Sequence, residues 1–191
     1  MSDDPQIERQ LLNLASDRPE VNRAAAAWFL TKGKGVAPAL AAALDDVRLG
    51  AVCHWRILLV LRQLKIKSTL PAILQVLWRN DPITRPGAME AAAVFATDEA
   101  VDALAGLINI ADRDVARHAA VLLGQTRAPR AVPHLERLLT DANPEVRSVA
   151  VRALGAVGDP AAHAVLQRHL GIETDGEVRE QIRAALGGSS A

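Results

Sequence analysis

The fold is decided by residues 141–170, DANPEVRSVAVRALGAVGDPAAHAVLQRHL. Asn143 before Pro144 and Asp159 before Pro160 are both typical of the start of a helix. Gly155 and Gly158 are expected to end the first of the two helices. Apolar residues follow at helical spacing in each half, and the stretch therefore predicts a pair of antiparallel helices. These apolar residues are Val146, Ala150, Ala153 and Leu154 in the first half and Ala162, Leu166 and Leu170 in the second.

The same pattern recurs along the chain at a nearly constant interval. Counting back from Leu154 in steps of 31 residues reaches Leu123, Ala92, Leu61 and Leu30. Leu166, Leu135, Leu104 and Ile73 are also 31 apart, and a step of 33 then reaches Leu40. A fixed period of this length is the signature of a helical repeat protein, because one helix pair cannot bury its apolar stripe without a neighbouring pair.

The repeat predicts an all-α fold, a right-handed α–α superhelix of about five helix pairs with a half-repeat cap at each end. We expect a single domain over residues 1–186, with a flexible tail at 187–191. We expect Leu30, Leu61, Leu123, Leu154, Leu135 and Leu166 to be buried. The expected repeats are 17–44, 47–77, 81–108, 112–139, 143–170 and the half-repeat 175–186.

The unit NPEVRSVAVRALGAVGDPAA, residues 143–162, resembles the short HEAT-like repeat family typified by phycobilin lyases and bacterial adaptor proteins. The resemblance covers nearly the whole chain and is strongest from about residue 110 to 186. It implies a helical solenoid. It implies function less sharply, because members of the family include lyases, hydroxylases, glycosylases and plain binding scaffolds.

The composition narrows the classes of partner. Twenty-two basic residues balance twenty-two acidic ones, whereas nucleic-acid binders usually carry a basic surplus. No apolar run approaches the roughly 20 residues of a membrane span, and the polar N-terminus is not that of a signal peptide. We therefore expect a cytoplasmic protein with no membrane role. The balanced charge also disfavours nucleic acid as a partner and leaves it the third alternative. Arginine outnumbers lysine 18 to 4, which is typical of a GC-rich bacterial genome.

The sequence offers no catalytic, cofactor-binding or metal-binding residues. Deoxyhypusine hydroxylase, which resembles the chain in its repeats, holds iron with His-Glu pairs, but Ala119 follows His118 here. No two histidines lie three or four residues apart, the spacing that places two ligands on one helical face. We expect His118, His134, His163 and His169 to be solvated, and the one cysteine, Cys53, to be buried and inert. The chain is interpreted as not being an enzyme.

The four lysines form the first candidate binding site. They are Lys32, Lys34, Lys65 and Lys67. Lys65 lies 33 residues after Lys32, and Lys67 lies 33 residues after Lys34. They therefore occupy equivalent turns of adjacent repeats, where they predict a basic edge that could bind an acidic partner segment. Ordinary solvated charge is the alternative.

The second candidate is the concave face, which we expect the second helix of each pair to line. Its central positions are small or apolar and could bind an apolar helix or an extended segment, although small residues also simply permit close helix packing. Trp28 and Trp55 align with polar positions of later repeats, so their rings are expected to be partly exposed, either in an interface or against a neighbouring repeat. The groove residues are Ala41, Ala42, Leu74, Gln75, Ala105 and Gly106.

These patterns favour a noncatalytic adaptor or scaffold that binds a protein partner through the concave face or the basic edge. The alternative is an accessory subunit or lyase-type enzyme that acts on a protein-bound chromophore or prosthetic group.

Overall fold

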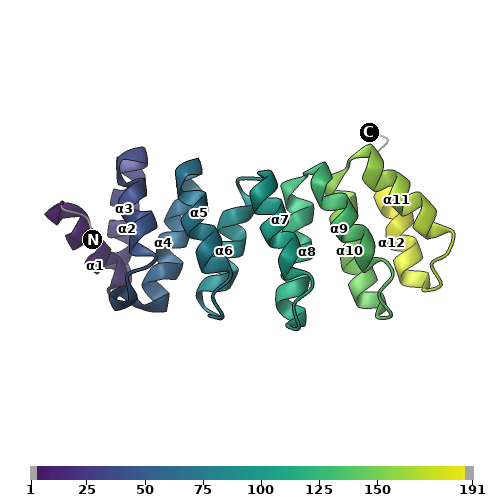
Figure 1. Ribbon diagram of the computed structural model, residues 1–191, viewed down its shortest axis with the longest axis horizontal. Coiled ribbons are helices and arrows are strands. Elements are labelled where there is room, and N and C mark those ends of the chain that lie inside the picture. Colours follow the sequence, from purple (N-terminus) through teal and green to yellow (C-terminus); the bar gives the residue numbers. More distant parts are fainter. Residues whose placement is uncertain (1–3, 188–191) are drawn as a thin grey trace. The chain divides into compact units, whose positions relative to one another are not determined.

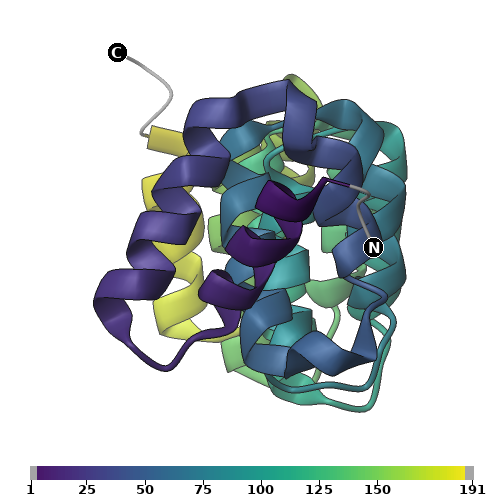
Figure 2. The ribbon, with the colours of Figure 1, turned by 90° about the vertical axis from the view of Figure 1, so that its left-hand side faces the viewer.

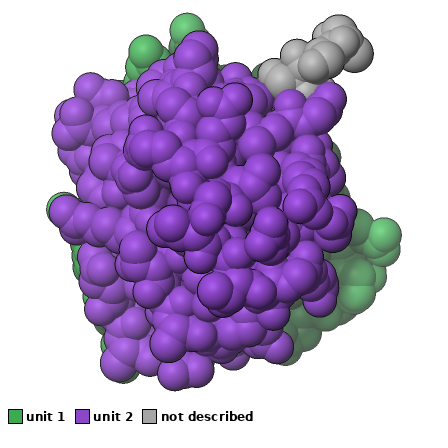
Figure 3. All heavy atoms as spheres, turned by 90° about the vertical axis from the view of Figure 1, so that its right-hand side faces the viewer, with its two compact units in different colours: residues 1–95 green, residues 96–191 purple. Residues whose placement is uncertain are grey.

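The computed structural model describes residues 4–187, and within them every regular element is a helix. Contacts between residues divide the chain into two compact units, residues 1–95 (unit 1) and 96–191 (unit 2), coloured separately in Figure 3. The predicted all-α fold of helix pairs is confirmed. The boundary between the units falls inside the third expected repeat, 81–108. The expected tail, apart from Gly187, lies outside the described residues.

Unit 1 contains a lone helix, two complete pairs and the first helix of a third pair (Figure 1). Short 3-10 helices lie in its turns. Two of them, η1 (Gly33–Val36) and η3 (Lys67–Thr69), join the members of a pair, whereas η2 (Val47–Leu49) leads from one pair to the next. The α-helices of unit 1 are α1 (Pro5–Ala15), α2 (Pro19–Lys32), α3 (Ala37–Ala43), α4 (Gly50–Leu64), α5 (Leu70–Leu77) and α6 (Thr84–Ala93).

Unit 2 begins with the second helix of the third pair, continues with two complete pairs and ends in a lone helix. Side-chain caps start these helices where the sequence predicted them, since Asn143 accepts from the backbone N–H of Glu145 and Asp159 from that of Ala161. The helices are α7 (Asp98–Leu107), α8 (Arg113–Thr126), η4 (Pro129–Ala131), α9 (Val132–Leu138), α10 (Pro144–Val157), α11 (Pro160–Leu170) and α12 (Gly176–Gly187).

The first helices of the pairs form the closely packed row in each unit. In unit 2, α10 contacts both α8 and α12 along much of its length, whereas the second helices α9 and α11 touch only slightly. In unit 1, α4 and α6 are similarly close, while α3 and α5 barely meet. Small residues make this possible, because a Cβ added to Gly124 of α8 would lie 2.7 Å from the Cα of Ala153 in α10.

Two details differ from the sequence prediction. Leu30 is only half-buried, and Phe29 occupies the core position instead. One residue along a helix rotates the side chain by about 100°, so the step between α2 and α4 is one residue longer than the assumed 31. Gly155 does not end its helix; it lies inside α10, where its missing side chain admits Ala185 of α12, and Gly158 in a left-handed conformation ends the helix. The other five leucines expected in the core are buried.

The lone helices cover the ends of their units. In unit 1, α1 packs on α2 and α4 through Ile7, Leu11 and Leu14, and it lies in front of them when viewed from the N-terminal end (Figure 2). The guanidinium of Arg56 fastens its end by donating to the carbonyl oxygens of Leu14 (2.7 Å) and Ser16 (2.9 Å). In unit 2, α12 packs on α10 and α11, with Val178 and Ile182 buried.

Replacement of Gly124 by Ala tests the importance of the close contact between first helices. The added methyl group would lie 2.7 Å from the Cα and 2.8 Å from the carbonyl oxygen of Ala153 in α10. Overpacking costs about 1–3 kcal/mol, and a clash with backbone atoms belongs to the upper part of that range, above the roughly 1 kcal/mol that Ala gains over Gly within a helix. Gly124→Ala should therefore lower the free energy of unfolding in a urea titration. Gly176→Ala is the matched control, because no atom lies within 4 Å of the position of its Cβ. An equal effect of the two substitutions would contradict the packing described.

Candidate protein-binding surfaces

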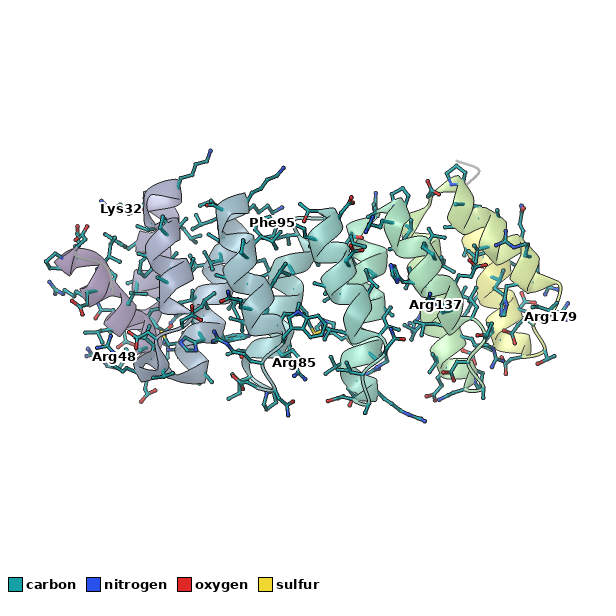
Figure 4. The ribbon with its side chains drawn as sticks, in the orientation of Figure 1. Lys32, Arg48, Arg85, Phe95, Arg137 and Arg179 are labelled. Atoms are coloured by element: carbon teal, nitrogen blue, oxygen red, sulfur yellow. The ribbon has the colours of Figure 1, made fainter. Side chains whose placement is uncertain are left out.

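The four lysines lie at two equivalent turns of unit 1, each between the first and second helix of a pair. Lys32 ends α2 and Lys34 lies in η1, while Lys65 follows α4 and Lys67 begins η3. The two turns are neighbours, because α3, which follows η1, contacts η3. Figure 4 labels Lys32 at this end of the helices and Arg48, from the turn after α3, at the other. We call these four residues the lysine edge.

All four lysine side chains are exposed. Within residues 4–187 none of them makes a salt bridge, and the Nζ of Lys32 lies 5.3 Å from the centre of the Trp28 ring, in a cation–π contact. Two arginines of unit 1 behave differently. Arg62 pairs with Glu90 and Arg79 with Asp45. The charges of the lysine edge are thus not neutralised by any carboxylate of the described residues.

Only some of the residues predicted to line a groove on the second helices are accessible to a partner. Ala41 of α3 and Leu74 of α5 are half-buried, and Gln75 is exposed, so these residues of unit 1 can reach a partner. Ala105 belongs to unit 2 and is only 3% exposed, because it faces the core beside Leu104. Ala105 is therefore a packing residue, which corrects its assignment to the binding face.

The two candidate tryptophans have different surroundings. Trp28 is half-buried and packs edge-on against Phe29, with ring centres 5.2 Å apart. Trp55 of α4 is 39% exposed and leans on α6, where a Cβ at Gly87 would lie 3.0 Å from its ring. The partial exposure expected of both rings is confirmed. Val52 of α4 and Ile83, in the turn before α6, are also exposed.

A groove missed by the sequence analysis lies in unit 2, on the row of first helices rather than on the second helices to which we had assigned the binding face. It has a volume of about 840 Å³ and runs across α8, α10 and the start of α12. Buried Ala120 and Val149 lie at its base, and the charged residues Asp114, Glu145 and Arg152 are exposed along it. The charged residues in the first turns of these helices were visible in the sequence, but the closer packing of this row of helices was not.

The most strongly perturbed buried carboxylate has a structural role. Glu173 is 4% exposed and follows α11, and Arg147 of α10 donates to it through Nε (2.9 Å) and Nη2 (2.7 Å). Its Oε2 also lies 2.9 Å from the Nε2 of His169, and the backbone N–H groups of Thr174 and Asp175 donate to Oε1. The hydrogen bonds from Arg147 are the main cause of a pKa lowered to about 2, against the opposing effect of burial.

His169 is therefore not the solvated residue that the sequence predicted. It is buried against Glu173, while His118, His134 and His163 are half-buried. The Glu173 cluster joins the start of α10, the end of α11 and the turn before α12, and it fastens the last helix of unit 2.

The single cysteine of the chain is shielded from solvent. Cys53 is 1% exposed, as expected, and burial raises the pKa of its thiol to about 11. Among the described residues, no group of three or more His, Cys, Asp and Glu side chains is placed to hold a metal ion. No helix in the same part of the chain is long and apolar enough to cross a membrane.

Comparison with known proteins identifies the type of fold. Residues 104–187 match the family model for HEAT repeats. The complex of CpcE and CpcF of phycocyanin lyase from Nostoc sp. is similar in structure, with a TM-score of 0.59 and 21% identity over 100% of this chain and 80% of that one. A designed armadillo repeat protein in complex with the peptide (KR)4 has a TM-score of 0.59 at 18% identity, over 99% and 100% of the two chains.

An engineered protein gives a TM-score of 0.55 at 21% identity, over 97% of each chain. No curated protein matches the sequence. Identities this low establish the fold alone. The chain has the fold of the HEAT and armadillo type of helical repeat protein, and residues 104–187 carry HEAT repeats.

Glu173→Gln should destabilise the protein near neutral pH, because Arg147 would lose its charged partner in a buried site. A carboxyl whose pKa is lower in the folded than in the unfolded chain stabilises the fold above the unfolded value, and this contribution is lost as the pH falls through the folded value. For Glu173 the loss should fall between pH 4.5 and about 2. Urea titrations of both proteins at several pH values should therefore show a gap in unfolding free energy that narrows on acidification. A gap independent of pH would contradict this role.

Proposed function

We propose that this chain is a noncatalytic scaffold that binds a segment of another protein, and that the lysine edge of unit 1 binds an acidic stretch of that segment. The observation that carries the proposal is the set of four exposed lysines at neighbouring turns, none of them in a salt bridge within residues 4–187. A lysine ammonium is a compact, hydrated charge on a flexible stem, which suits steering and reversible contact with a charged partner.

The distribution of charge supports this assignment. The chain is neutral overall, but residues 1–95 contain twelve basic and nine acidic residues, whereas residues 96–191 contain ten and thirteen. All four lysines belong to the basic unit. A partner with an acidic segment would therefore be attracted to unit 1 by a field wider than the edge itself.

The fold supports the general role. Helical repeats expose long rows of side chains at regular spacing and are widely used as binding surfaces. The similar designed armadillo repeat protein was determined in complex with a charged peptide. The similarity to CpcE and CpcF concerns the fold, and we assign lyase chemistry to no residue of this chain.

Reversal of the charge at the centre of each turn, in the double variant Lys34→Glu/Lys67→Glu, should weaken binding of a fluorescein-labelled peptide of alternating Glu and Ser at least tenfold. Fluorescence anisotropy at two salt concentrations measures this effect, which should shrink as salt screens the interaction. The melting temperature should change little, because exposed charges contribute little to stability.

Arg9→Glu/Arg18→Glu is the control, since it makes the same change in net charge at exposed positions of α1 and its following turn. Equal weakening by the two double variants would show that only net charge matters and would contradict a site at the lysine edge. Leu74→Glu tests the rival site on α5. If capture of partners from the native host fails with Leu74→Glu but survives the lysine reversals, the second helices bind the partner.

A further inference from the structure

The groove of unit 2 has the form of a binding site that is separate from the lysine edge. Its base is apolar, with Ala120, Val149 and Val178 buried beneath it. Ser148 of α10 also lines the groove, and its hydroxyl donates to Oε1 of Gln181 in α12 (2.6 Å). A volume of about 840 Å³ lies within the range of ligand-binding clefts in proteins.

The acidic side chains of the groove recur with the repeat. Asp114, Glu145 and Glu177 each belong to the first turn of a first helix, on α8, α10 and α12 in turn. All three line the groove and are exposed. Their helices are neighbours in one closely packed row, so the carboxylates should follow one another at the spacing of packed helices, about 8–10 Å.

The net charge of the groove is negative. Its lining contains five carboxylates and three guanidinium groups. One of the three, Arg117, is paired with Asp114 at 3.2 Å on the open surface, where a salt bridge contributes little and is easily exchanged. Glu145 makes no side-chain hydrogen bond or salt bridge within the described residues.

The spacing of the carboxylates indicates the shape of the ligand. A chain in the polyproline II conformation advances 3.1 Å per residue with three residues per turn, so every third side chain points the same way at intervals of about 9 Å. This interval matches the spacing of neighbouring packed helices. A groove that crosses three helices would span about seven residues of such a chain.

We propose that the unit 2 groove is a second protein-binding site, which takes an extended partner segment with Lys or Arg at every third residue. Successive basic side chains would meet Asp114, Glu145 and Glu177, while the smaller residues between them lie over the apolar base. The chain would then carry two sites of opposite charge preference, an acid-binding edge in unit 1 and a base-binding groove in unit 2.

The test uses the full chain and two labelled heptapeptides of identical composition, Lys-Ser-Ser-Lys-Ser-Ser-Lys and Lys-Lys-Lys-Ser-Ser-Ser-Ser. Anisotropy should show that the spaced peptide binds at least threefold more tightly than the block peptide. Glu145→Arg should weaken binding of the spaced peptide at least tenfold. Ala116→Trp, which places a large ring on the α8 wall of the groove, should weaken it comparably.

Glu99→Arg is the matched control, because Glu99 is also an exposed first-turn acid of a unit 2 helix but does not line the groove. It should change the affinity by less than about twofold. Equal effects of Glu99→Arg and Glu145→Arg would overturn the proposal, since the peptide would then respond only to the net charge of the unit. Full binding by Ala116→Trp would place the peptide outside the groove, and equal binding of the two peptides would overturn the match to the helix spacing.

The same assay separates this proposal from the proposed function. Lys34→Glu/Lys67→Glu should leave binding of the spaced basic peptide unchanged, and Glu145→Arg should leave binding of the acidic peptide unchanged. Loss of basic-peptide binding in the lysine variant would show that the two surfaces are not independent sites and would overturn the groove assignment.

Discussion

In unit 2, each first helix packs on the next at a point where the side chain is no larger than a hydrogen atom or a methyl group. Gly124 meets Ala153, and Gly155 meets Ala185. Because the backbones approach so closely there, the first helices form a tight row and the second helices of each unit are left further apart. The position of the groove follows from this arrangement, since it crosses the starts of α8, α10 and α12, where the turns between pairs meet the row.

Three arginines and the four lysines of the chain have different surroundings. The three arginines hold parts of the fold together: Arg56 fastens α1, Arg79 joins the turns after α3 and α5, and Arg147 organises the turn before α12. The planar guanidinium of arginine can donate to two acceptors at once, which suits such fixed roles. Lysine occurs only at the lysine edge, where no described residue pairs with it. The gathering of all four lysines at two neighbouring turns, without a salt bridge among the described residues, is the strongest reason to look for a partner at that edge.

The repeat could be predicted from sequence because it rests on local chemistry. Capping residues, helix-initiating prolines and leucines at a period of 31 are each visible in the chain, and together they gave the helix pairs. The groove could not be predicted in the same way. Its location depends on which row of helices packs more closely, and that is decided by contacts such as Gly124 with Ala153 between residues 29 positions apart.

Similar reasons explain the individual errors. Glu173 shows no pattern that distinguishes it from a solvated acid until Arg147 is brought beside it, so the burial of His169 could not be foreseen. Leu30 and Phe29 are both large and apolar, and the choice between them depends on one extra residue in the step from α2 to α4. The lysine edge was predictable because adjacent turns of a repeat are adjacent in space.

The buried thiol of Cys53 can be used to measure how often α1 opens. It lies beneath α1, with Sγ 3.8 Å from the carbonyl oxygen of Leu11, and it is the single thiol of the chain. Burial keeps it protonated and out of reach of reagents, so it can be alkylated only in molecules whose α1 has lifted away. The rate of modification therefore reports every event that exposes this thiol, with no label introduced and no other thiol in the chain. Modification faster than global unfolding then identifies local opening of α1, and modification at the rate of global unfolding identifies a cooperative event.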